Sequence, residues 1–153
     1  MNGQRINSSV EMEQLGAALA KACRSGGLIF LEGELGAGKT TLVRGLLRAL
    51  GWQGKVKSPT YTLLEDYEID GYQICHMDLY RLLDPEELEW LGIRDVLNQD
   101  TLCLVEWPDK GSGILPAPDL RVEIHYRGEA REVHLLASGD VGDAILSNMN
   151  ALT

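Results

Sequence analysis

The sequence lacks the long apolar runs and the basic excess that mark several classes of protein. No apolar stretch approaches the roughly 18 residues of a membrane-spanning helix, and Met1–Arg5 lead into no apolar secretory core. Twenty-three acidic and fourteen basic residues give a formal charge of −9, which argues against a broad nucleic-acid-binding surface. We therefore expect a cytoplasmic protein that contacts neither a membrane nor DNA.

Cysteine is also scarce. Cys23, Cys75 and Cys103 are odd in number, far apart and set among apolar neighbours, so we expect buried reduced thiols, with neither a disulfide nor a zinc site. The 153 residues, of which 44% are hydrophobic and 24% charged, can form a full core without such cross-links. With no repeat and no long linker, we expect a single domain over residues 1–153.

Hydrophobic periodicity predicts alternating helices and strands in the first half of the chain. Ser8 and Glu11 have the spacing of a capping box, and the helix that they open would end near residue 26. A short apolar run over residues 28–31 is typical of a strand buried on both faces. An amphipathic pattern over residues 42–50 predicts a second helix.

Paired strands dominate the second half. Asp70-Gly71 is the signal of a type I′ turn, so residues 61–80 predict a hairpin, and alternation over residues 122–135 predicts another with one wet face. Further expected elements are a short helix over residues 84–92, a buried strand over residues 101–107 and a terminal helix from Gly142. The sum is an α/β domain with a mixed, mainly parallel central sheet and β-hairpins.

One stretch fits the phosphate-binding pattern G-x-x-x-x-G-K-[ST] at every fixed position, between a predicted strand and a predicted helix. Its glycines let successive N–H groups point at phosphate oxygens, and the helix places the positive end of its dipole there. Lys39 would contact the β- and γ-phosphates, and the Thr40 hydroxyl would ligate Mg²⁺. We therefore predict a P-loop NTPase-like domain. The expected nucleotide-binding residues are Gly33, Glu34, Leu35, Gly36, Ala37, Gly38, Lys39, Thr40 and Thr41.

Two acidic residues end apolar runs and are the candidates for catalysis. Glu106 would hold Mg²⁺ directly or through water. It replaces the usual aspartate, and Trp107 takes the place of a second acid; an ordinary exposed glutamate is the alternative. Asp78 could reach the γ-phosphate, the attacking water or the water shell of the metal. It could equally pair with Arg81.

Other polar residues fit both a functional and a structural interpretation. Ser58-Pro59-Thr60 lies in the connection where switch-type NTPases sense the γ-phosphate, but a proline-stiffened turn accounts for it equally well. His125 and His134 fall on the wet face of the second hairpin. A zinc site needs more ligands than the sequence shows, so we expect both to be surface residues.

Four motifs in this order and spacing resemble the TsaE family, also called YjeE. The phosphate loop is shared by many families, and the specificity lies in the other three. These are Ser58-Pro59-Thr60-Tyr61, His76-x-Asp78-Leu79-Tyr80-Arg81 and Leu104-Val105-Glu106-Trp107. The resemblance runs from about Ser8 to the second hairpin, and the region after Pro108 carries no matching motif.

The resemblance implies a P-loop ATPase of bacterial tRNA threonylcarbamoyladenosine biosynthesis. The modified adenosine lies next to the anticodon in tRNAs that read codons beginning with A. ATP hydrolysis, weak in the isolated protein, would reset a complex with the partners TsaB and TsaD, through which tRNA is met indirectly. Thr40 and Glu106 would be the Mg²⁺ ligands, and Asp78 would take part in hydrolysis. Ser58 to Thr60 would sense the nucleotide, and Trp107 would move with the nucleotide state.

A phosphate loop does not identify the base of the nucleotide. The guanine-reading pattern Asn-Lys-x-Asp is absent, so we expect ATP.

Two other functions stay open on the residues alone. A small P-loop metabolite kinase usually brings lid arginines over the phosphates, and only Arg81 and Arg94 lie between Glu65 and Glu106. The lack of a conventional acid pair also fits a nucleotide-binding module without turnover.

The negative charge is unevenly distributed. Residues 35–64 hold five bases and no acid, whereas residues 65–106 hold twelve acids and two bases. A triphosphate would therefore meet the locally favourable segment at the phosphate loop. The strip from Arg44 to Lys57 extends beyond that loop and could face tRNA or an acidic partner, with a solvated helix face and loop as the alternative.

Overall fold

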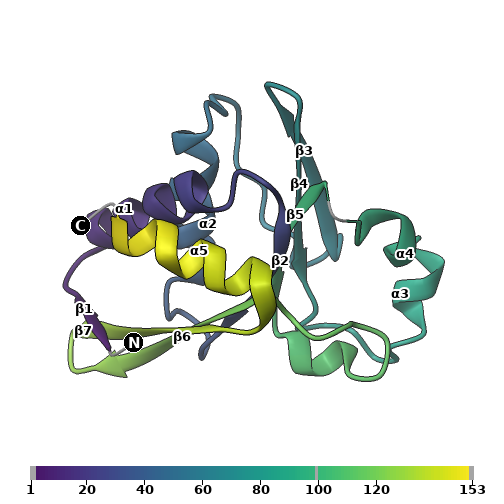
Figure 1. Cartoon of the computed structure of the whole chain (residues 1–153). Coiled ribbons are helices and arrows are strands. Elements are labelled where there is room, and N and C mark those ends of the chain that lie inside the picture. The colour runs from purple at the N-terminus through teal and green to yellow at the C-terminus, as the bar shows by residue number, and fades with distance from the viewer. Residues whose placement is uncertain (1–2, 99, 152–153) are drawn as a thin grey trace.

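The computed structural model describes residues 3–98 and 100–151, in which one seven-stranded sheet carries helices on its two faces (Figure 1). The strand order across the sheet is β1-β7-β6-β2-β5-β4-β3. The strands are β1 (Gln4–Ile6), β2 (Gly27–Glu32), β3 (Leu64–Ile69), β4 (Tyr72–Asp78), β5 (Thr101–Glu106), β6 (Leu120–Arg127) and β7 (Ala130–Ala137). The helices are α1 (Ser9–Ala22), α2 (Lys39–Ala49), α3 (Glu87–Trp90), α4 (Ile93–Val96), the 3₁₀ helix η1 (Pro108–Gly111) and α5 (Gly139–Ala151). No helix in this part of the chain is long and apolar enough to cross a membrane.

Parallel pairing is confined to the middle of the sheet. Strands β6, β2, β5 and β4 are parallel neighbours, whereas the hairpins β6–β7 and β3–β4 and the edge strand β1 pair antiparallel. The predicted mixed α/β sheet is confirmed, and so is the turn between β3 and β4, where Asp70 and Gly71 both have positive φ, 49° and 83°. Ligands of such sheets bind at the carboxyl ends of the strands. The phosphate loop leaves β2 at that edge.

Alternation along the strands divides the core into two layers. Helices α1, α2 and α5 lie on one face, and α3 and α4 lie toward the other (Figure 1). On β4, Ile74 packs in the first layer and Met77 in the second. Because successive side chains point to opposite faces, His76 and Asp78 share the face of Ile74. On β5 the same rule places Glu106 with Leu104, on the side of α2.

The predicted N-terminal cap of α1 is present, whereas the predicted end of this helix is shifted. The backbone N–H of Glu11 donates to the Ser8 hydroxyl at 3.2 Å, and the Glu11 carboxylate accepts from the N–H of Asn7 at 2.9 Å. The predicted capping box is therefore present, with its second half shifted by one residue. Helix α1 ends at Ala22, before the glycines expected to stop it.

The short elements differ most from expectation. The helix expected over residues 84–92 is a capped turn followed by α3: the Glu87 carboxylate accepts from the N–H groups of Leu83 and Asp84 at 3.0 and 2.9 Å. Strand β1, helix α4 and η1 were not predicted, since three or four residues show no periodicity. The terminal helix begins three residues earlier than expected. The three cysteines are buried and unpaired, as expected.

Helices α1 and α2 pack backbone to backbone through two glycines. A Cβ on Gly16 would lie 2.1 Å from the carbonyl oxygen of Leu42, and a Cβ on Gly45 would lie 2.2 Å from that of Glu13. Such distances are far shorter than any ordinary van der Waals contact. The N-terminal turn of α2, and with it the phosphate loop, is thus held against α1.

We expect Gly45→Ala to destabilise the fold by about 1–3 kcal/mol, the usual cost of overpacking a core. Helix propensity alone predicts the opposite sign, because alanine is favoured over glycine by about 1 kcal/mol. Urea unfolding decides between them. The control is Gln14→Ala on the exposed side of α1, which should change stability by less than about 0.5 kcal/mol. A stabilised Gly45→Ala variant would contradict the close crossing.

Candidate functional site

The phosphate loop has the geometry that its sequence predicts. Gly36 and Gly38 have φ values of 78° and 117°, a region that strongly favours glycine. Gly38 is the N-cap of α2, and no side-chain hydrogen bond caps this helix end. The first N–H groups of α2 therefore keep their capacity to bind an anion.

Lys39 is buried at the start of α2. Its Nζ donates to the carbonyl oxygen of Gly33 at 2.5 Å and lies 3.9 Å from the centroid of the Trp107 ring. The Trp107 ring in turn lies 5.0 Å from that of Tyr80. Burial lowers the pKa of Lys39, while neighbouring carboxylates, first of all Glu106, act in the opposite direction.

Glu106 ends β5 and is only 3% exposed, so the alternative of an ordinary exposed glutamate is wrong. The Thr40 hydroxyl donates to its Oε2 at 3.2 Å, and the Nε2 of His76 lies 2.6 Å from the same oxygen. His76 is fully buried, and its Nδ1 has no hydrogen-bond partner among the described residues. In the tautomer in which Nε2 donates to Glu106, the Nδ1 atom is an acceptor.

The sequence did not reveal this role of His76, although the residue belongs to a quoted motif. Residues 76 and 106 are thirty positions apart, and they meet because β4 and β5 pair in parallel with His76 opposite Leu104 and Asp78 opposite Glu106. The available signal was the polar pair His76 and Asp78 at alternate positions of an otherwise apolar strand. Such an alternation places both side chains on one face.

Thr40 and Glu106 fit a Mg²⁺ ion. Both offer hard oxygen donors, which Mg²⁺ prefers, and Mg²⁺ commonly takes one or two protein ligands with phosphate and water oxygens completing its octahedron. Within the described residues, no group of three or more His, Cys, Asp or Glu is arranged to hold a metal ion. The donor set therefore suits a metal that binds together with a nucleotide.

Asp78 ends β4 and joins the predicted switch to the site. Its Oδ1 accepts from the N–H of Tyr80 at 3.0 Å, and its Oδ2 accepts from the Thr60 hydroxyl at 3.4 Å. Thr60 Oγ1 lies 2.8 Å from the hydroxyl of Ser58. The predicted alternative partner, Arg81, lies instead over the Tyr61 ring, 4.5 Å from its centroid.

The second hairpin supports the phosphate loop from the other side, which the sequence did not predict. The Tyr126 hydroxyl donates to the carbonyl oxygen of Leu35 at 2.7 Å, and the Nε of Arg131 donates to that of Ala37 at 3.1 Å. The Arg131 guanidinium also lies 4.1 Å from the centroid of the Tyr126 ring. These residues lie in a region without a matching motif, and they reach the loop only through the β2–β6 pairing.

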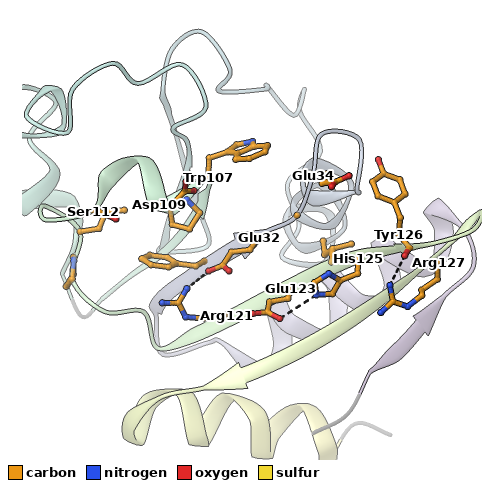
Figure 2. Close-up of a pocket in the computed structure, with 16 residues that line it drawn as sticks. Glu32, Glu34, Trp107, Asp109, Ser112, Arg121, Glu123, His125, Tyr126 and Arg127 are labelled. Carbon is orange, nitrogen blue, oxygen red and sulfur yellow. Dashed lines mark hydrogen bonds and ion pairs between the residues drawn. The ribbon is translucent and has the colours of Figure 1, made fainter.

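Two hollows flank the loop. The larger, about 860 Å³, lies between the loop, residues 107–116 and β6. Within it Arg121 pairs with Glu32, and His125 lies beside Glu123 (Figure 2). The smaller, about 170 Å³, is lined by Ser8, Arg131 and residues 36–38. The smaller hollow adjoins the glycines of the loop, whereas the larger adjoins its first residues and Trp107.

The basic strip beyond the loop is only partly available to a partner. Arg48 donates to the carbonyl oxygens of Trp52 and Gly54 at 2.9 and 2.6 Å, so it fixes the chain after α2. Lys55 and Lys57 have exposed side chains. A contact of this strip with tRNA stays a hypothesis.

Comparison with known proteins agrees with this geometry. The family described as "Threonylcarbamoyl adenosine biosynthesis protein TsaE" matches residues 6–133. The chain belongs to the TsaE family.

Relatives with the TsaE name occur in distant bacteria. The "tRNA threonylcarbamoyladenosine biosynthesis protein TsaE" of Haemophilus influenzae is 57% identical over 120 residues, which cover 78% of this chain and 76% of that protein. The protein of the same name from Bacillus subtilis is 38% identical over 128 residues, with 83% and 78% covered. A crystal structure of Bacillus subtilis YdiB superposes with a TM-score of 0.84 at 27% identity, covering 98% of this chain and 94% of that one. The names of the TsaE relatives place the family in tRNA threonylcarbamoyladenosine biosynthesis.

Ionisation of the buried Asp78 carboxyl should lower the stability of the fold in a pH-dependent way. Burial raises the pKa of its carboxyl, against the N–H of Tyr80, which lowers it. The folded state therefore holds the proton more tightly than the unfolded chain. Stability is lost as the pH rises from the unfolded pKa through the raised folded one.

We accordingly expect Asp78→Asn to raise the melting temperature at pH 7–8 by roughly 2–4 °C, the shift that about 1 kcal/mol produces in a domain of this size. The gain should vanish near pH 3, where the Asp78 carboxyl is mostly protonated in the folded and in the unfolded chain. Thermal unfolding over this pH range measures both. Asp143→Asn, at an exposed position of α5, should show no gain. A lower melting temperature of Asp78→Asn at pH 8 would contradict the cost of ionisation.

Proposed function

We propose that this chain is a Mg²⁺-dependent ATPase of tRNA threonylcarbamoyladenosine biosynthesis, cytoplasmic, which resets a TsaB–TsaD complex by hydrolysing ATP between rounds of modification. The observation that carries the proposal is the meeting of the phosphate loop, Glu106 and Asp78 at the carboxyl ends of three neighbouring parallel strands. The names of the relatives support the process. The tRNA substrate would be met through the complex, at the adenosine next to the anticodon in tRNAs that read codons beginning with A.

Phosphate binding falls to the loop and Lys39. The uncapped N–H groups at the start of α2 bind phosphate oxygens along the helix axis. Lys39 exchanges the Gly33 carbonyl for the β- and γ-phosphates. Since a charged acceptor strengthens a hydrogen bond about twofold over a neutral one, this exchange favours the triphosphate.

Thr40 and Glu106 would hold the metal. Mg²⁺, when bound, neutralises charge that develops on the phosphate oxygens during transfer. His76 keeps the Glu106 carboxylate in place through the 2.6 Å contact at Oε2. The histidine is itself enclosed by the core, so it fixes one orientation of a carboxylate that would otherwise be free to rotate.

Asp78 orients the attacking water. It lies opposite Glu106 on the adjacent strand, and its raised pKa makes it a better proton acceptor than an exposed aspartate. The Thr60 hydroxyl bound to it belongs to the segment that senses the γ-phosphate. The Trp107 ring covers Lys39, so it changes position when the γ-phosphate binds.

The nucleoside lies on the opposite side of the loop from Trp107. There the smaller hollow brings Ser8 and Arg131 beside Gly36 and Gly38. The larger hollow adjoins only the first residues of the loop and Trp107, away from these two glycines.

Hydrolysis with and without partners tests the proposal. Phosphate release from ATP, measured for the chain alone and with TsaB–TsaD, should rise at least severalfold in the complex. Lys39→Ala should lose ATP affinity by about 10- to 150-fold, the equivalent of a charge-assisted contact of roughly 1.5–3 kcal/mol. Lys55→Ala, an exposed lysine beyond the loop, is the control and should bind ATP normally. An absence of stimulation would overturn the proposed partnership, and normal ATP binding by Lys39→Ala would overturn the phosphate site.

A second experiment addresses the metal. Glu106→Ala should reduce Mg²⁺-dependent hydrolysis by at least tenfold, because it removes a proposed metal ligand. Nucleotide binding without Mg²⁺ should change little or tighten, since one negative charge near the phosphates disappears. Calorimetric titration with and without Mg²⁺ separates the two effects. Asp109→Ala, which also removes a carboxylate near Lys39, should retain the Mg²⁺ dependence. Equal losses with and without Mg²⁺ would show Glu106 to be structural.

A further inference from the structure

Two large apolar side chains project from the face that carries α3. Leu83 is 94% exposed and Trp90 is 88% exposed, whereas their neighbour Leu88 is fully buried. Single exposed apolar residues are ordinary on protein surfaces. Here, however, the most exposed leucine and tryptophan among the described residues lie seven positions apart, on one short segment.

This segment is firmly anchored, so its exposed side chains are not those of a loose loop. Leu82, Leu88 and Ile93 fill the second core layer. The Glu87 carboxylate closes the turn before α3 by accepting from Leu83 N and Asp84 N. Leu83 and Trp90 are thus presented to solvent from a fixed segment, residues 82–96, which we call the platform. Its rigidity lowers the entropy cost of binding through these two side chains.

The platform is strongly acidic. Residues 84–95 contain five acids and a single base, Arg94. That base is bound to the Glu89 carboxylate by two hydrogen bonds of 3.0 and 2.7 Å, so it does not offset the remaining acids. A surface of this sign repels nucleic acid, anionic lipid and a second copy of the same face. It attracts a basic protein surface.

The platform also adjoins the nucleotide site. Asp78 and Tyr80 lie at the start of the connection that leads to Leu83, and the N–H of Leu79 donates to the Glu106 carbonyl at 3.0 Å. Tyr80 contacts the Trp107 ring, which covers Lys39. A partner held at Leu83 and Trp90 therefore touches a segment that begins at Asp78.

We propose that Leu83 and Trp90, on the segment that carries the acids of residues 84–95, form the docking surface for a partner protein that offers an apolar pocket bordered by lysine or arginine. The inference rests on the proposed function, because it takes the partner to be the complex that stimulates hydrolysis. Tryptophan buried at the centre of an interface is the residue type that most often dominates binding. The acids steer association and make it sensitive to salt.

The test measures binding of the full chain to the TsaB–TsaD complex, with ATP and Mg²⁺ present. Trp90→Ala and Leu83→Ala should each weaken binding by about tenfold or more and reduce stimulated hydrolysis, while hydrolysis by the chain alone stays unchanged. Leu136→Ala is the matched control, because Leu136 is an exposed leucine of β7, which three strands of the sheet separate from β4, the strand that leads to α3. It should bind like the wild type.

Charge reversal tests the acidic part separately. Glu86→Lys should weaken binding and flatten its dependence on salt, whereas Asp143→Lys on α5 changes the net charge equally and should do neither. Wild-type binding by both Trp90→Ala and Leu83→Ala, or equal losses in Leu136→Ala, would overturn the docking surface alone. A wild-type chain that does not bind TsaB–TsaD would overturn the proposed function together with it. If the wild-type chain forms a dimer and Trp90→Ala dissociates it, the surface binds a second copy of the chain and the proposed partner is wrong.

Discussion

A buried carboxylate imposes the strictest constraint in this molecule. Glu106 lies at 3% exposure, and its Oε2 is reached by Thr40 from α2 and by His76 from β4. An ionised group in such a place is costly unless donors surround it. The parallel register of β4 with β5 and the seating of α2 on the sheet must therefore both be correct for Glu106 to be tolerated.

The same constraint explains the charge balance around the phosphate loop. Lys39 is a buried ammonium facing the carboxylates of Glu106, Asp78 and Asp109. A triphosphate alone would add negative charge to this group, and a Mg²⁺ ion held by Thr40 and Glu106, as proposed, would offset it. On the proposed function, the site would favour the nucleotide and the cation together over either one.

What the sequence predicted, and what it could not, follows from how far apart the contacting residues lie in the chain. The phosphate loop is contiguous, so its pattern identified its residues and its place between a strand and a helix. Glu106 and Asp78 could be predicted to lie near each other because each ends a strand, and the ends of neighbouring parallel strands meet. The contacts of His76, Tyr126 and Arg131 depend on strand order and register, which no local pattern encodes. The short elements β1, α4 and η1 were missed because they are too brief to show a period.

The two sides of the phosphate loop differ in what holds them. On one side Tyr126 and Arg131 bind backbone carbonyls of the loop from a paired hairpin, so this side is fixed to the sheet. On the other side Thr60 reaches Asp78 through a 3.4 Å hydrogen bond, and Trp107 covers Lys39 with its ring. Long hydrogen bonds and ring contacts are exchanged for phosphate contacts at lower cost than a paired strand is displaced. If the chain is the proposed ATPase, movement caused by the γ-phosphate would be directed toward Tyr80 and the acidic segment beyond it, and away from the hairpin.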